Sequence, residues 1–157
     1  MEDFGDEGMR VDDQISLFSL AILRNDVQPA VQLAAAQDIS TFGFFQRSSV
    51  GEFMTFFSKT VAERTRAGQR QDVEENSEVT PVFRNSCLSR NGANIDYVGH
   101  VYARTEGVVD VLISDKDYPL RVAYSVLSKV LDEFLQRYPR SKFKSATSLD
   151  FPELYSV

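Results

Sequence analysis

The segment that most limits the fold is ISLFSLAIL, residues 15–23, because apolar side chains occupy both of its faces. Side chains of a strand alternate between two faces, so such a run has to be covered on both sides. We therefore expect a central strand with other elements packed over each face of its sheet. Residues 30–39, AVQLAAAQDI, follow a polar turn and predict a second strand, although the alanine run leaves a helix as the alternative.

A first helix is predicted from residue 49 to about residue 66. Ser49 precedes Glu52 by three residues, the spacing of a capping box, in which each side chain bonds the backbone N–H of the other residue. Gly68 follows closely and is typical of the end of a helix. Along this helix the apolar stripe that should face the sheet consists of Val50, Phe53, Met54, Phe57 and Val61.

Three further strands and a second helix complete the pattern. The strands are expected at residues 69–75, 95–105 and 108–115, and Glu106 and Gly107 suit a tight hairpin turn between the last two. Residues 76–94 mix Pro, Asn, Ser and Gly, which predicts a flexible loop insertion.

The second helix should run between Pro119 and Pro139. Apolar residues recur along it every three or four positions, at Leu120, Tyr124, Leu127, Leu131, Phe134 and Tyr138. Residues 148–155 are expected to hold a short final helix. Neighbouring strands joined by short turns favour antiparallel pairing, so the chain predicts an α+β fold.

The charge distribution excludes one function class. The chain has 157 residues and a net charge of −6, but residues 1–13 hold six acidic residues against one arginine. We interpret these residues as an acidic, flexible extension and residues 14–157 as the domain. No basic stripe is present, so we do not expect a nucleic-acid partner. The sequence also contains no apolar run long enough to span a bilayer and no signal peptide.

Phe56 does not belong to the stripe of the first helix. At 100° per residue it lies about 115° from the centre of that stripe, facing away from the core. A single exposed apolar residue needs no function, and the 76–94 segment could also cover it. We favour a groove that binds an apolar partner, lined by Phe56 together with Phe45, Phe53 and Val73.

The sequence does not assemble a catalytic constellation. The single histidine, His100, falls in a predicted strand and is expected to be structural. The single cysteine, Cys87, is distant from it, so the spacing of metal ligands is missing. We therefore expect no catalytic residues, no metal and no cofactor, and we expect that the chain is not an enzyme.

Several long runs resemble one family. The segments FGFFQRSSVGEFMTFFSKTVAERT, AGQRQ, YVGHVYART and VLISDKDYPLRVAYSVL together resemble the longin domain of the prenylated R-SNAREs. The resemblance covers about residues 15–139 and fails over residues 1–13 and 76–94. It implies a longin (profilin-like) fold, in which a five-stranded antiparallel sheet carries one helix on one face and two on the other.

The resemblance also implies a function. In this family the longin domain precedes a SNARE motif and a C-terminal lipidated cysteine, and neither pattern occurs in this sequence, so we expect a piece of a longer protein. The groove at Phe56 would bind the protein's own SNARE motif and its prenyl or acyl lipid in a closed, soluble state. Opening would release the SNARE motif to other SNAREs, and the lipid to a membrane.

The implied location is the cytoplasm, with cycling to Golgi, endosomal, vacuolar and other vesicle membranes. The alternative is a longin-fold interaction subunit of a coat or tethering complex in membrane trafficking. A heptad-repeat segment with a central arginine beyond residue 157 would separate the two.

Overall fold

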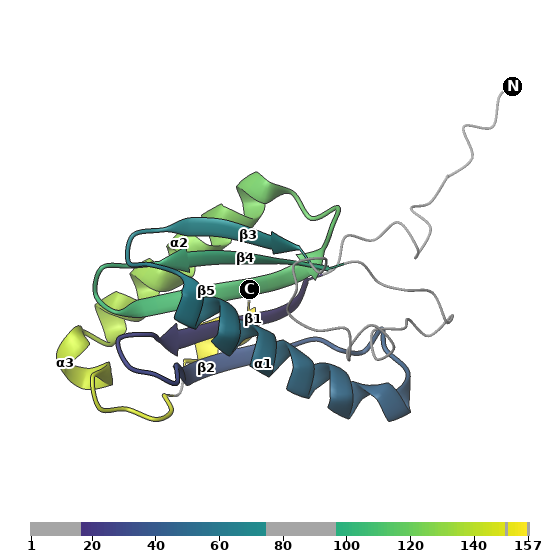
Figure 1. Cartoon of the computed structure of the whole chain (residues 1–157), viewed down its shortest axis with the longest axis horizontal. Helices are drawn as coiled ribbons and strands as arrows, with labels where there is room; N and C mark the ends of the chain where they lie inside the picture. The colour runs from purple at the N-terminus through teal and green to yellow at the C-terminus, as the bar shows by residue number, and fades with distance from the viewer. Residues whose placement is uncertain (1–16, 75–96, 150, 157) are drawn as a thin grey trace, which may run out of the picture.

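The computed structural model describes residues 17–74, 97–149 and 151–156, which form an antiparallel five-stranded sheet between layers of helix (Figure 1). The expected acidic extension at residues 1–13 and the expected insertion at residues 76–94 lie outside the described residues. The strands are β1 (Leu17–Arg24), β2 (Val31–Gln37), β3 (Arg70–Glu74), β4 (Tyr97–Ala103) and β5 (Val108–Asp115). Their order across the sheet is β2-β1-β5-β4-β3, so β1 is an inner strand and β2 and β3 are the edges.

Strand β1 shows why the sheet is covered on both faces. Ala21 and Leu23 belong to one buried apolar cluster, whereas Leu20 and Ile22 belong to another. The expectation of a central strand is thereby confirmed, and the alanine-rich segment forms β2 rather than a helix.

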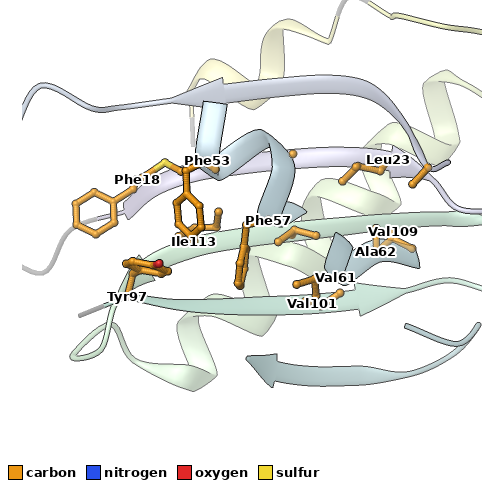
Figure 2. Packing of buried hydrophobic residues seen from close by; sticks show 14 of the residues in the cluster. Phe18, Leu23, Phe53, Phe57, Val61, Ala62, Tyr97, Val101, Val109 and Ile113 are labelled. Carbon is orange, nitrogen blue, oxygen red and sulfur yellow. The ribbon is translucent and has the colours of Figure 1, made fainter. Parts of the chain in front are cut away.

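The first cluster lies beneath α1 (Arg47–Arg64). All five predicted stripe residues of this helix are at most 3% exposed. Figure 2 shows Phe53, Phe57 and Tyr97 pointing toward one another between α1 and the sheet, and the ring centroids of Phe53 and Tyr97 are 5.2 Å apart.

The prediction that Ser49 caps this helix is wrong. A short 3-10 helix, η2 (Phe44–Gln46), leads directly into α1, whose N-cap is Gln46 without a side-chain hydrogen bond. Arg47 holds this start of the helix by donating hydrogen bonds to the backbone oxygens of Phe42 and Ser40, at 3.3 Å each. Ser49 is therefore the third residue of the helix and not its N-cap.

The second cluster lies beneath α2 (Leu120–Arg137), together with α3 (Arg140–Phe143) and the 3-10 helix η4 (Pro152–Ser156). Leu127, Leu131 and Phe134 are fully buried, as the periodicity of this helix predicts. Leu120 departs from that prediction at 51% exposure, because Ala123 occupies the inward position in the first turn. The short helix expected within residues 148–155 is the 3-10 turn η4.

Two glycines of the described chain have positive φ angles, which residues with a side chain rarely adopt. Gly107 has φ +89° in the β4–β5 hairpin, where the Arg104 N–H donates to the Val108 oxygen at 2.9 Å, so the predicted turn is confirmed. Gly68 has φ +79° but lies in the connection to β3, beyond the end of α1 at Arg64.

Candidate partner-binding site

A surface pocket of about 580 Å³ lies between α1 and the end of β2. Helix α1 forms one wall, and the chain that leaves β2 forms the other. Its lining residues are Gln37, Ile39, Arg47, Ser48, Gly51, Glu52, Thr55, Phe56 and Lys59.

One glutamine connects the two walls of the pocket. The side-chain amide of Gln37 donates to the Gly51 oxygen at 3.3 Å and to Thr55 Oγ1 at 3.4 Å. A β-carbon on Gly51 would lie 3.1 Å from Gln37 Oε1, so the missing side chain at residue 51 allows this close approach. The edge strand and the helix are therefore joined beside the pocket.

Phe56 and Ile39 supply the apolar part of the lining. Phe56 is 48% exposed, and Ile39 is half-buried. Arg47 and Lys59 add positive charge to the rim, and Glu52 adds a negative charge. Such a lining suits a partner that inserts an apolar side chain and makes polar contacts around it.

The structure does not bring the four predicted groove residues together. Phe56 lines the pocket, but Phe45 is 93% exposed on η2, stacked edge-on against Phe44, and is not among the lining residues. Phe53 is 3% exposed in the core beneath α1. Val73 is half-buried on β3 and packs against that same core.

Gln37 and Ile39 are pocket residues that the sequence analysis did not single out. They come from the end of the second predicted strand, and Gln37 reaches a helix residue 14 positions later. No local sequence pattern signals that contact, because it depends on how the sheet and helix pack.

A second polar cluster lies at the other edge of the sheet and has the residue types of a hydrolase triad. Asp72 Oδ1 is 2.8 Å from Nδ1 of His100, and Nε2 of His100 is 3.1 Å from Oγ of Ser114. Those distances resemble an acid, a base and a nucleophile.

The surroundings of this serine do not suit nucleophilic attack. Ser114 is fully buried, and its hydroxyl donates to the backbone oxygen of Asp115 at 2.9 Å. A nucleophile needs an approach for substrate, and this oxygen lies inside the fold. We therefore do not interpret the cluster as a nucleophilic site, and the pocket beside Phe56 is the candidate site.

Metal-binding clusters and membrane-spanning helices are both missing from the described residues. In the part of the chain that the structure describes, no three His, Cys, Asp or Glu side chains are grouped closely enough to hold a metal ion. Within those same residues, every helix is too short or too polar to cross a membrane.

The family model for the longin domain, described as regulated-SNARE-like, matches residues 39–157. Synaptobrevin homolog ykt6 of Schizosaccharomyces pombe is 52% identical over 141 residues, which cover 89% of this chain and 62% of that protein. Synaptobrevin homolog YKT6 of Saccharomyces cerevisiae is 44% identical over 131 residues, covering 83% of this chain and 56% of that protein. The chain thus spans about three fifths of the length of these relatives.

Proposed function

Because this chain belongs to the longin family of regulated-SNARE-like domains, we propose that it is the N-terminal regulatory and targeting domain of a vesicle-fusion SNARE. In this proposal the domain binds the SNARE motif and the lipid of its own full-length protein and keeps that protein closed and soluble. Release then makes the SNARE motif available to other SNAREs, and the lipid attaches the protein to Golgi, endosomal or vacuolar membranes.

One observation carries the proposal, namely the half-exposed ring of Phe56 beside the pocket. Covering one Phe side chain is worth about 1.5–3 kcal/mol, or roughly ten- to a hundredfold in affinity. That gain is small for two separate molecules. It is sufficient when the ligand is part of the same chain, because a tether raises the effective concentration of the ligand.

Such a closed state would open by competition. Partner SNAREs that bind the SNARE motif more tightly than the pocket does would shift the population toward the open form. A modest affinity at Phe56 therefore suits a domain that has to release its ligand.

The test is an amide NMR titration of this domain with the SNARE segment of its own full-length protein, with and without the lipid. We expect shifts at Gln37, Ile39, Thr55 and Lys59 in the wild type and none in Phe56→Ser. Leu120→Ser is the matched control, since Leu120 is 51% exposed on the opposite face of the sheet and should leave the titration unchanged.

Equal amide shifts in the wild type and in a folded Phe56→Ser variant would show that Phe56 is not part of the binding site. If the wild type does not respond to the segment with or without lipid, the closed-state proposal fails.

A further inference from the structure

Four side chains from four elements form one continuous series of hydrogen bonds. The series begins at β3, which is an edge strand of the sheet (Figure 1). The Tyr124 hydroxyl of α2 donates to Oδ1 of Asp72 on β3 at 2.8 Å. The same carboxylate oxygen contacts Nδ1 of His100 on β4 at 2.8 Å. His100 Nε2 lies 3.1 Å from Oγ of Ser114 on β5, and that hydroxyl donates to the Asp115 oxygen at 2.9 Å.

Donor and acceptor counting determines where the hydrogens in this series lie. A carboxylate only accepts, so the contact with Asp72 requires a hydrogen on Nδ1 of His100. The single hydroxyl hydrogen of Ser114 is used on the Asp115 oxygen, so Oγ has to accept from Nε2. All four bonds therefore exist together only when both ring nitrogens of His100 carry a hydrogen, which is the cationic imidazolium.

Loss of one proton breaks the series at a defined place. A neutral ring that keeps its bond to Asp72 presents a lone pair at Nε2 to Ser114. The serine hydroxyl then turns toward Nε2 and gives up the Asp115 oxygen, because it has only one hydrogen to donate. The Asp115 oxygen then loses the bond from Ser114 and keeps the one from the Tyr118 N–H, which at 3.3 Å is longer.

We propose that Asp72, His100, Ser114 and Tyr124 form a proton-operated latch, which holds the β5–α2 turn and the β3 edge when His100 is protonated and loosens the turn when it is not. The turn is the segment after Asp115, where the Tyr118 N–H also bonds the Asp115 oxygen at 3.3 Å. The two states of the latch differ by one proton on the His100 ring, so pH is the variable that moves the latch between them.

Charged and titratable groups surround the His100 ring. Burial raises the pKa of Tyr124, and its hydrogen bond to Asp72 raises it further, so this phenol stays a donor throughout. Arg70 stacks on the same tyrosine, with its guanidinium carbon 5.7 Å from the ring centroid. The titratable or charged groups around the cluster are Arg70 and Asp72 on β3, Tyr102 on β4, Asp110 and Asp115 on β5, Tyr118 after β5, and Tyr124 on α2.

The expected sign follows from linkage. The series is complete only while His100 carries both ring hydrogens, so protection of the turn should be higher in that state and lower in the state with one ring hydrogen. One proton limits the change to about tenfold in the opening equilibrium per pH unit.

The experiment measures amide hydrogen exchange at Asp117 and Tyr118 and at the β3 residues Asp72 and Val73, between about pH 5 and 8, corrected for intrinsic exchange. It uses the full chain in an Asp110→Asn background, because Asp110 lies on the same sheet face and its burial produces a slope of the same sign. The ¹⁵N shifts of the His100 ring are recorded in parallel, and they count the ring hydrogens directly.

Two variants remove the latch at different points, a third serves as a control, and a fourth tests the bond to β3 separately. Asp72→Asn and Ser114→Ala should each abolish the pH dependence of protection at the turn. Ser58→Ala should keep it, since Ser58 is an equally buried serine on α1 whose hydroxyl has no hydrogen-bond partner within the described residues. Tyr124→Phe should lower protection of β3 at every pH and retain the slope at the turn.

The ring measurement is also made on the wild-type chain, so a variant that fails to fold does not leave the latch untested. Two ring hydrogens at low pH and one at high pH, with a matching fall in protection, support the latch. A ring with a single hydrogen across the whole range, or a slope that persists in Asp72→Asn or Ser114→Ala, overturns it.

Discussion

The ring of Phe57 lies so close over Gly99 that a β-carbon on that glycine would stand 2.4 Å from Cε1 of the ring. Phe57 comes from α1 and is 2% exposed, whereas Gly99 belongs to β4 and pairs with Val73 of β3. The missing side chain at residue 99 therefore sets how closely α1 approaches the sheet.

Gly99→Ala is expected to lower the free energy of unfolding by about 1–3 kcal/mol, the usual cost of overpacking a core. The cause is that the Phe57 ring has to leave its place between α1 and β4. Denaturant unfolding followed by circular dichroism measures the change. Adding Phe57→Leu should recover part of the loss, because the smaller side chain leaves room for the new methyl group.

Gly43→Ala is the control for this prediction, since a β-carbon there would approach no atom closer than 3.4 Å. If Gly99→Ala unfolds at the same denaturant concentration as Gly43→Ala, the proposed clash is absent in solution.

The stripe of α1 and the hairpin at Gly107 could be predicted because both depend on residues near in sequence. The start of α1 could not, since Arg47 reaches back to the Ser40 and Phe42 oxygens and extends the helix ahead of Ser49. The capping box at Ser49 thus yields to contacts five and seven residues apart, for which the sequence carries no capping pattern.

The candidate site was predictable only at Phe56. Its exposure follows from helical geometry alone, but the wall opposite it depends on packing between elements. Gln37 reaches Gly51 across the gap between strand and helix, and Asp72 meets Tyr124 from 52 residues away. Neither contact leaves a pattern in the sequence.

Asp110 should make the domain less stable as pH rises. Burial raises the pKa of its carboxyl well above the ordinary value, and both carboxyl oxygens lack a hydrogen-bond partner among the described residues. The folded state therefore holds a proton that the unfolded chain releases near pH 4. Stability should be greatest below about pH 4 as far as this group is concerned, and it should fall from there up to the folded pKa.

Asp110→Asn should flatten that part of the pH profile, and Asp110→Val should raise the free energy of unfolding near neutral pH by about 1–3 kcal/mol. Urea unfolding at several pH values measures both effects. Asp117→Asn, an exposed substitution with the same change in charge, should keep the wild-type profile. An unchanged profile in Asp110→Asn would mean that the carboxyl is ionised at no cost in the folded protein.

Phe134 organises the core beneath α2. Its ring centroid lies 5.3 Å from that of Tyr138, 5.9 Å from that of Phe143 and 5.5 Å from that of Phe151. Phe134→Ala should therefore cost about 3–5 kcal/mol, the range for emptying a buried aromatic site.

The same helix provides a control for Phe134. Leu120→Ala removes apolar atoms that are half in solvent, so it should change the free energy of unfolding by less than about 0.5 kcal/mol. Thermal unfolding of the two variants compares them. Similar losses in both would show that the ring cluster adds little beyond the average contact of α2.

Phe45 and Phe56 should differ in function although both are exposed and neither belongs to the buried core. Phe56 lines the pocket and Phe45 does not, so a ligand that fills the pocket buries only the first. With the SNARE segment of the full-length protein as ligand, Phe56→Ser should weaken binding roughly ten- to a hundredfold. Phe45→Ser should leave the affinity within about twofold, and both variants should unfold within about 0.5 kcal/mol of the wild type. Isothermal titration calorimetry with each variant measures the affinities. An equal loss of affinity for Phe45→Ser would mean that the binding surface extends beyond the pocket onto η2.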